Sequence, residues 1–124
     1  MLALSPYIQP FLVHHTLKDV SVPIMYQGGT LDYGITPSLH RGGGAYDESL
    51  PPKYLVEFSR ASHLAWTDSG KAAHEPIIAY GLAFMDHYVK GQPDPKRLSR
   101  VLPGVSHYRY SSEIGSVTGA KPRK

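Results

Sequence analysis

The sequence predicts an α/β fold in which helices cover a mostly parallel sheet. Residues 22–27 and 53–58 are nearly continuous apolar runs, as expected of strands buried on both faces. They alternate with glycine- and proline-containing loops, and a single long segment, residues 76–90, has the apolar periodicity of a helix. The chain has 124 residues, of which 41% are hydrophobic and 19% charged, which fits one domain of this class.

The three predicted strands have clear boundaries. A short apolar stretch at residues 1–4 reads as a strand that ends at Ser5 and Pro6. The strand at 22–27 tolerates Pro23 near its start and is expected to break at the glycine pair that follows it. Residues 7–19, between these strands, read as a loop with one helical turn. The strand at 53–58 follows a pair of prolines.

The helix expected at 76–90 begins with Pro76 in its first turn and stops before Gly91. Its apolar residues are spaced by four, three and four positions, which places them on one helix face: Ile78, Leu82, Met85 and Val89. We expect this face, widened by Ile77, Phe84 and Tyr88, to be buried against the sheet.

Charge divides the chain into two parts. Residues 1–95 carry six Lys/Arg against nine Asp/Glu, a net charge of −3, whereas residues 96–124 carry seven against one, a net charge of +6. The second part is interpreted as a basic tail that is partly disordered, with 96–110 able to pack back onto the body. Such a tail could bind anionic surfaces, but no nucleic-acid motif accompanies it, so a solvated tail is the preferred interpretation.

Two polar residues follow consecutive strands. Asp32 comes shortly after the strand at 22–27, and His63 follows the strand at 53–58. Functional groups of parallel sheets gather in loops at the carboxyl ends of the strands, so we expect the two side chains at one edge. The competing interpretations are a turn-forming aspartate and a surface histidine.

These segments resemble the α/β-hydrolases. The likeness lies in VPIMYQGGTLD at 22–32, KYLVEF at 53–58 and RASHLAWTD at 60–68, and it covers residues 1–95. The most similar branch is the dienelactone-hydrolase-like group, with bacterial cutinases and platelet-activating-factor acetylhydrolase relatives. The resemblance implies a partial three-layer α/β-hydrolase fold and a carboxylic-ester hydrolase, in which Asp32 is the acid and His63 the base of a Ser-His-Asp triad.

The chain departs from that family in one motif. No G-x-S-x-G occurs in the 124 residues; the nearest match, GVSHY at 104–108, has tyrosine in fifth place and follows the histidine. The resemblance therefore implies the C-terminal region of a hydrolase, with the nucleophile outside this chain and its strand normally paired with the outer side of residues 1–4. The alternative is a non-catalytic interaction or assembly module on the same scaffold.

Two further residues near His63 have competing interpretations. Trp66 is a candidate for lining an acyl or alcohol pocket, or for simple packing. Asp68 is an alternative partner for His63, although capping of the following turn is preferred.

Partners and cofactors follow from the same patterns. No cofactor is expected: cysteine is absent, and the seven histidines lack metal-binding spacing. An ester substrate is expected if the nucleophile is supplied; nucleic acid and a membrane span are not expected. We also expect a homodimer through the unprotected edge of residues 1–4, unless 96–110 cover that edge.

Overall fold

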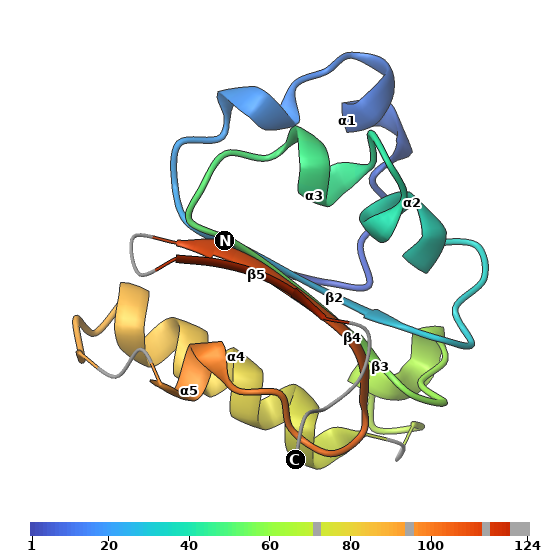
Figure 1. The fold of residues 1–124 in the computed structure, drawn as a ribbon. Helices are drawn as coiled ribbons and strands as arrows, with labels where there is room; N and C mark the ends of the chain where they lie inside the picture. The colour runs from blue at the N-terminus through green and yellow to red at the C-terminus, as the bar shows by residue number, and fades with distance from the viewer. Residues whose placement is uncertain (71–72, 94–95, 113–114, 120–124) are drawn as a thin grey trace.

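The computed structural model describes residues 1–70, 73–93, 96–112 and 115–119, the last of these as backbone only. A five-stranded sheet lies between two helical layers (Figure 1). Its order is β1 (Leu2–Leu4), β2 (Ile24–Gly29), β3 (Lys53–Phe58), β4 (Val105–Ser112) and β5 (Gly115–Gly119). The first three strands are parallel, and β4 and β5 continue the sheet antiparallel. This mixed sheet with helices on both faces agrees with the predicted α/β class.

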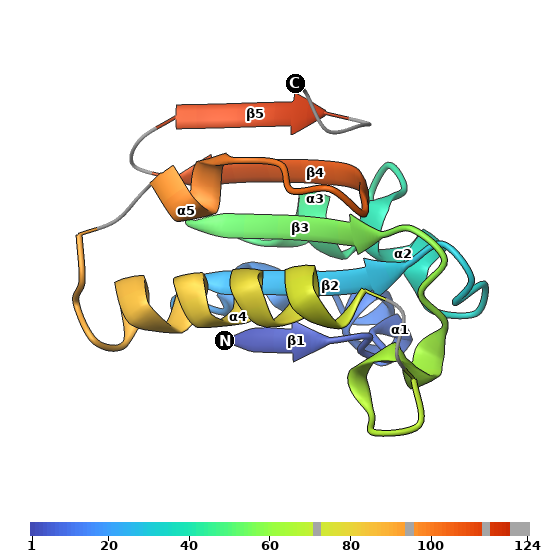
Figure 2. The same cartoon turned by 90° about the horizontal axis from the view of Figure 1, so that it is seen from below.

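Short helices cover one face of the sheet: α1 (Gln9–Val13), the 3₁₀ turn η1 (Leu17–Asp19), α2 (Thr36–His40) and α3 (Ala45–Glu48). The other face carries α4 (His74–Tyr88) and α5 (Lys96–Ser99) (Figure 2). A further 3₁₀ turn, η2 (His63–Trp66), follows β3. None of the helices in the described ranges combines the length and apolar character needed to cross a bilayer.

Alternate residues of the central strands, β2 and β3, pack into two separate hydrophobic cores on opposite faces of the sheet. On β2, Met25 points into the core beneath α4 and α5, whereas Ile24 and Tyr26 belong to the core beneath α1, α2 and α3. Residues of β3 alternate in the same way, with Leu55 on the α1–α3 side. Burial on both faces explains why these strands read as continuous apolar runs rather than as alternating ones.

The glycine pair predicted to end the second strand instead lies inside it. Gly28 and Gly29 pair with Glu57 and Phe58 of β3. A Cβ on Gly29 would sit 2.1 Å from the carbonyl oxygen of Ala61. The glycine is therefore needed for close backbone approach, and the turn begins only after it.

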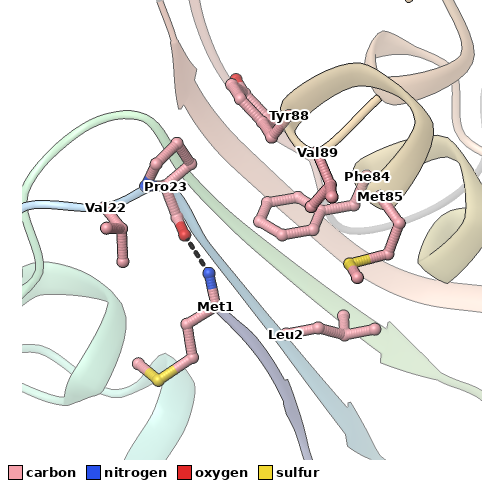
Figure 3. A pocket seen from close by; sticks show the side chains of 8 residues that line it. All are labelled: Met1, Leu2, Val22, Pro23, Phe84, Met85, Tyr88 and Val89. Carbon is pink, nitrogen blue, oxygen red and sulfur yellow. Dashed lines mark hydrogen bonds between the residues drawn. The ribbon is translucent and has the colours of Figure 1, made fainter. Parts of the chain in front are cut away.

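The central stripe of the predicted buried face of the long helix was wrong, whereas the residues expected to widen that face do contact the core: Phe84 is buried, and Ile77 and Tyr88 pack against it. Ile78, Leu82, Met85 and Val89 are 56%, 53%, 40% and 68% exposed, whereas the buried residues of α4 are Tyr80, Ala83 and Phe84. The aromatic residues face the sheet in place of the aliphatic stripe because their rings fill the space over β3. Tyr80 contacts Phe58, and Phe84 meets Tyr54 edge to face. Two residues of the exposed aliphatic stripe, Met85 and Val89, line a groove beside β1 (Figure 3).

The segment 96–124, interpreted as a basic tail, is largely part of the domain where the structure describes it. Leu98 of α5 and Tyr108 of β4 are buried, and β4 pairs with all six residues of β3, with one register shift near Phe58. Arg97 pairs with Asp86 at 2.9 Å, and Arg109 pairs with Asp47 at 3.0 Å. These basic residues thus dock on acidic groups of the body; the disorder expected at 113–114 and 120–124 lies outside the described residues.

Candidate active site

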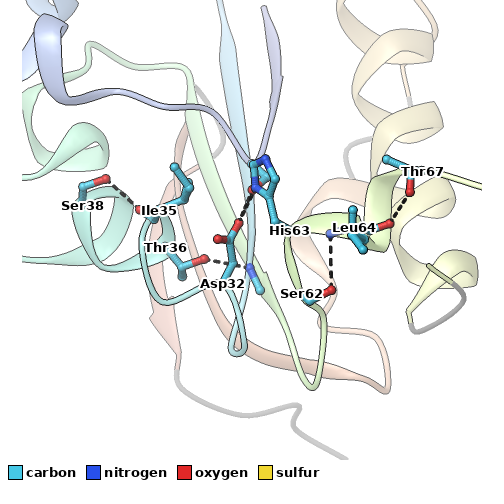
Figure 4. A network of polar contacts seen from close by, with 10 residues as sticks. Asp32, Ile35, Thr36, Ser38, Ser62, His63, Leu64 and Thr67 are labelled. Atoms are coloured by element: carbon cyan, nitrogen blue, oxygen red, sulfur yellow. Dashed lines mark hydrogen bonds and ion pairs between the residues drawn. The ribbon is translucent and has the colours of Figure 1, made fainter. Parts of the chain in front are cut away.

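Three loops meet at the carboxyl edge of the parallel strands. Ser5 follows β1, Asp32 follows β2, and His63 follows β3 at the start of η2. The two residues singled out from the sequence are in contact: Asp32 Oδ2 lies 2.9 Å from His63 Nδ1, although 31 positions separate them (Figure 4). The topology of a parallel sheet explains this meeting, because all three strands end on the same side.

The Asp32 carboxylate is buried and held by its own loop. Only 6% of the residue is exposed. Its backbone carbonyl accepts hydrogen bonds from Ile35 N–H at 3.2 Å and Thr36 N–H at 3.0 Å, so the residue also forms the turn that leads into α2. Asp32 thus forms the turn through its backbone carbonyl and contacts His63 through its carboxylate. The tight turn fixes the direction in which the carboxylate points.

The His63 side chain is 62% exposed and is anchored through one ring nitrogen. Nδ1 lies against the Asp32 carboxylate and 2.8 Å from Ser5 Oγ. An unprotonated Nδ1 would place a lone pair against a carboxylate oxygen, so the neutral ring carries its proton on Nδ1. Nε2 is then the nitrogen with a free lone pair, which is what a general base requires.

The loops that carry Asp32 and His63 are bound to each other by backbone contacts. Leu31 N–H donates to the carbonyl of Ala61 at 3.0 Å, and Arg60 N–H donates to Thr30 Oγ1 at 2.7 Å. The close approach of Gly29 to Ala61 belongs to the same junction. The separation of the acid and the base is therefore set by rigid backbone rather than by side-chain flexibility.

Ser5 is a site residue that the sequence analysis missed, since it was read only as the end of a strand. Its hydroxyl donates to Asp32 Oδ2, and its own backbone has a φ of 46°, in the left-handed region. Its position directly after a strand, on the edge shared with Asp32 and His63, is the signal that could have identified it. Ser5 is not placed as a nucleophile, because it contacts Nδ1 on the carboxylate side rather than Nε2.

Trp66 is held firmly near this edge. Its Nε1–H donates to Gln27 Oε1 at 2.9 Å, and its ring meets Phe58 edge to face. With Leu4 and Ile78 it also lines a shallow pocket beside η2. Packing and pocket lining therefore coexist, and substrate binding by Trp66 stays a prediction.

Asp68 lines the same pocket, but within the described chain it has no contact with His63, whose carboxylate partner is Asp32. The described residues also contain no group of three His, Asp or Glu side chains that could hold a metal ion. The acid–base chemistry of the site is therefore that of the pair formed by Asp32 and His63, supported by Ser5.

The arrangement lacks a group to activate: in the described residues, no hydroxyl is recorded at His63 Nε2. What it can do on its own is accept a proton at Nε2 and stabilise the resulting imidazolium through the buried carboxylate. The chain matches no known family model and no curated protein sequence, so the likeness seen in its motifs rests on those motifs and on this geometry.

Proposed function

We propose that this chain supplies the acid and the base of a carboxylic-ester hydrolase triad, whose nucleophilic serine belongs to a segment outside the 124 residues. The observation that carries the proposal is the 2.9 Å contact between a buried Asp32 carboxylate and Nδ1 of an exposed histidine. A purely structural ion pair gives no reason to leave Nε2 of the ring accessible. The α/β-hydrolase-like motifs around both residues support the same function.

In this mechanism His63 Nε2 removes the proton from the serine hydroxyl as the serine oxygen attacks the ester carbonyl. The proton passes to the leaving alcohol when the carbon–oxygen ester bond breaks. A water molecule then repeats the cycle and releases the acid. Asp32 keeps the Nδ1 proton throughout and stabilises the imidazolium, while the Ser5 hydroxyl holds the carboxylate in place.

The substrate class is an ester with an apolar acyl or alcohol part. The pocket lies beside η2, the turn that begins at His63, and its lining includes the apolar surface of Leu4, Trp66 and Ile78 as well as the polar Thr67, Asp68 and His74. No cofactor is required, because the serine, the imidazole and water supply every group that the reaction needs.

A second candidate function, a non-catalytic assembly module on the same scaffold, is favoured by a different observation. The aliphatic stripe of α4 is exposed beside an open strand, as expected of a surface that binds another chain. Under this alternative, the contact between Asp32 and His63 only stabilises the loop junction.

One experiment separates the two functions. The genomic reading frame upstream of codon 1 is examined for a G-x-S-x-G segment, and the longest in-frame product is assayed with p-nitrophenyl acetate. We expect turnover that falls by at least about a thousandfold in His63→Ala. The exposed His14, replaced by alanine, is the matched control and should leave turnover unchanged. Turnover that survives His63→Ala, or an upstream frame without a serine-bearing segment, contradicts the hydrolase and leaves the assembly module.

A further inference from the structure

The side chain of Gln27, on β2, is polar and yet fully buried in the core of the sheet. Burial of an amide costs free energy unless the amide is hydrogen-bonded. Its Oε1 accepts from Trp66 Nε1–H at 2.9 Å, and an indole nitrogen can only donate. The amide nitrogen makes two longer contacts, at 3.5 Å to the carbonyl oxygen of Ile77 and at 3.6 Å to Met25 Sδ. The shortest hydrogen bond of this buried amide is therefore the one to Trp66.

Trp66 and His63 stand at the two ends of the same turn, since η2 comprises His63–Trp66. A 3₁₀ helix has three residues per turn, so side chains three positions apart lie on the same side of it. Both side chains contact the segment of chain that forms β2. Trp66 contacts Gln27 within the strand, and His63 contacts Asp32 beyond its end. η2 is thus attached to one strand at two points, which fixes its rotation about its own axis.

The hydrogen bonds within η2 hold the turn together without attaching it to β2 (Figure 4). Ser62 Oγ accepts from Leu64 N–H at 3.3 Å, and the carbonyl of Leu64 accepts from both the N–H and the hydroxyl of Thr67. Ala65 is buried and adds apolar contact, which is not directional. The hydrogen bond to Gln27 supplies direction at the end of the turn that lies away from the histidine.

We infer that Gln27 is a positioning residue of the candidate active site: by holding Trp66 it fixes the rotation of η2 and keeps His63 Nδ1 against the Asp32 carboxylate. Gln27 acts through the turn and touches no reacting atom. The catalytic meaning of this inference rests on the proposed function, because a rotated ring would aim Nε2 away from the serine. The contacts that connect Gln27 to His63 belong to the 124 residues alone.

The backbone of Gln27 serves the same site independently of its side chain. Its carbonyl accepts from Ser5 N–H at 2.8 Å, and the Ser5 hydroxyl donates to Asp32 Oδ2. A substitution at position 27 keeps this backbone carbonyl. Side-chain variants therefore test the link to Trp66 separately from the link to Ser5.

Two substitutions remove the hydrogen bond between Gln27 and Trp66 from opposite sides. Gln27→Met keeps the length of the side chain without the acceptor, and Trp66→Phe keeps an aromatic ring without the donor. NMR of the 124-residue chain measures how fast the His63 Nδ1 proton exchanges with water, at a pH where the ring is neutral. We expect each variant to raise this exchange rate by about fivefold or more, the factor expected for loss of one hydrogen bond.

The matched control is Tyr26→Phe. It also removes a buried side-chain hydrogen bond of β2, the 2.6 Å contact with Ser49 Oγ, but on the opposite face of the sheet. It should leave the exchange rate of the His63 proton unchanged. A control that accelerates exchange as much as Gln27→Met would overturn the inference, because any loss of stability in β2 would then have the same effect.

The double variant separates positioning from stability. With Gln27→Met and Trp66→Phe together no polar partner is left unpaired, so urea denaturation should show that much of the stability lost in Gln27→Met returns. The His63 proton should still exchange fast, because the directional bond is still absent. The inference is overturned if both single variants exchange at the parent rate, or if the double variant regains the parent rate together with its stability.

Fluorescence provides an independent measurement, because Trp66 is the only tryptophan of the chain. Gln27→Met should add a fast component to the decay of its anisotropy, which Tyr26→Phe should not. Equal decays in the parent chain and Gln27→Met also overturn the inference. Neither measurement involves ester hydrolysis. Absence of turnover in the longer product would therefore remove the proposed function and leave the positioning of His63 by Gln27 standing.

Discussion

The two flanks of the parallel strands differ sharply. On one side β1 is three residues long, has one neighbour among the described strands and lies beside an exposed aliphatic stripe. On the other side β4 is eight residues long, and its Tyr108 is fully buried among Tyr80 and Tyr110. The comparison teaches that the two sides are packed differently: buried aromatic rings concentrate on the β3–β4 side, whereas exposed aliphatic side chains lie towards β1.

The β4 flank is closed by charge as well as by aromatic packing. Arg109 on β4 pairs with Asp47 and lies 4.2 Å above the Tyr46 ring, in cation–π geometry. Burial raises the pKa of Tyr46 to about 12, with the nearby Arg109 charge opposing that shift. The ion pair and the Tyr46 ring therefore hold the basic Arg109 of β4 against α3.

The largest effect is expected from breaking the closed flank. Tyr108→Ala removes a fully buried ring and its hydrogen bond to the carbonyl of Leu98, and should lower the free energy of unfolding by about 3–5 kcal/mol. The control Tyr7→Ala, at an exposed position, should change it by less than about 0.5 kcal/mol. Urea denaturation followed by circular dichroism measures both. Equal, small effects would mean that β4 is not part of the cooperative unit.

A smaller effect is expected where the two site loops touch. Gly29→Ala inserts a Cβ against the Ala61 carbonyl and should destabilise the fold by about 1–3 kcal/mol while separating Asp32 from His63. Gly34→Ala is the matched control, because no atom lies within 4 Å of its Cβ position. Stability is measured by thermal unfolding, and the loop contact by the chemical shifts of the His63 ring. A Gly29→Ala protein as stable as Gly34→Ala contradicts the tight junction.

Removal of the Ser5 hydroxyl should cost about 1 kcal/mol of stability, because the buried Asp32 carboxylate loses one donor. Ser5→Gly also loses the hydroxyl but relieves the positive φ of 46°, so it should be more stable than Ser5→Ala by up to about 1 kcal/mol. Chemical denaturation of both variants tests this order. If the alanine variant is as stable as the parent chain, the hydroxyl has no role in holding the carboxylate.

The smallest expected effect is the pH dependence of stability that arises from His107 on β4. Burial lowers the pKa of His107 below its ordinary 6.5, and His40 and Arg109 lower it further, while Glu57 opposes them. The unfolded chain therefore takes up the proton first, so this contribution to stability is complete above pH 6.5 and is lost as the pH falls below it. An NMR titration should place the His107 pKa below 6.5, and Glu57→Gln should lower it again. A value above 6.5 would contradict the burial of this ring.

The site was largely predictable because its positions follow from topology. Strand ends on a parallel sheet converge, so Asp32 and His63 could be paired from the sequence alone, and the structure places them in contact. Ser5 could have been identified by the same reasoning, but it was interpreted only as the end of a strand. Its role depends on a hydroxyl direction that a left-handed backbone sets, and sequence patterns do not reveal that direction.

The errors in the fold have a different cause. α4 is apolar on more than one face, so periodicity alone could not decide which of its apolar residues would be buried: Phe84 was expected in the buried face, but Tyr80 was not. That choice depends on the rings that β3 and β4 present to the helix. β4 and α5 were missed because their basic residues, Arg109 and Arg97, indicated a solvated tail; the ion pairs with Asp47 and Asp86 depend on the fold and are not visible in the sequence.

The central claim, that Asp32 prepares His63 to act as a base at Nε2, is tested most directly by ¹⁵N NMR of the imidazole ring in the 124-residue chain. At a pH where the ring is neutral, we expect the proton on Nδ1, with a downfield proton resonance that Asp32→Asn shifts upfield or abolishes. A ring that carries its proton on Nε2, or one whose spectrum Asp32→Asn leaves unchanged, would contradict the account.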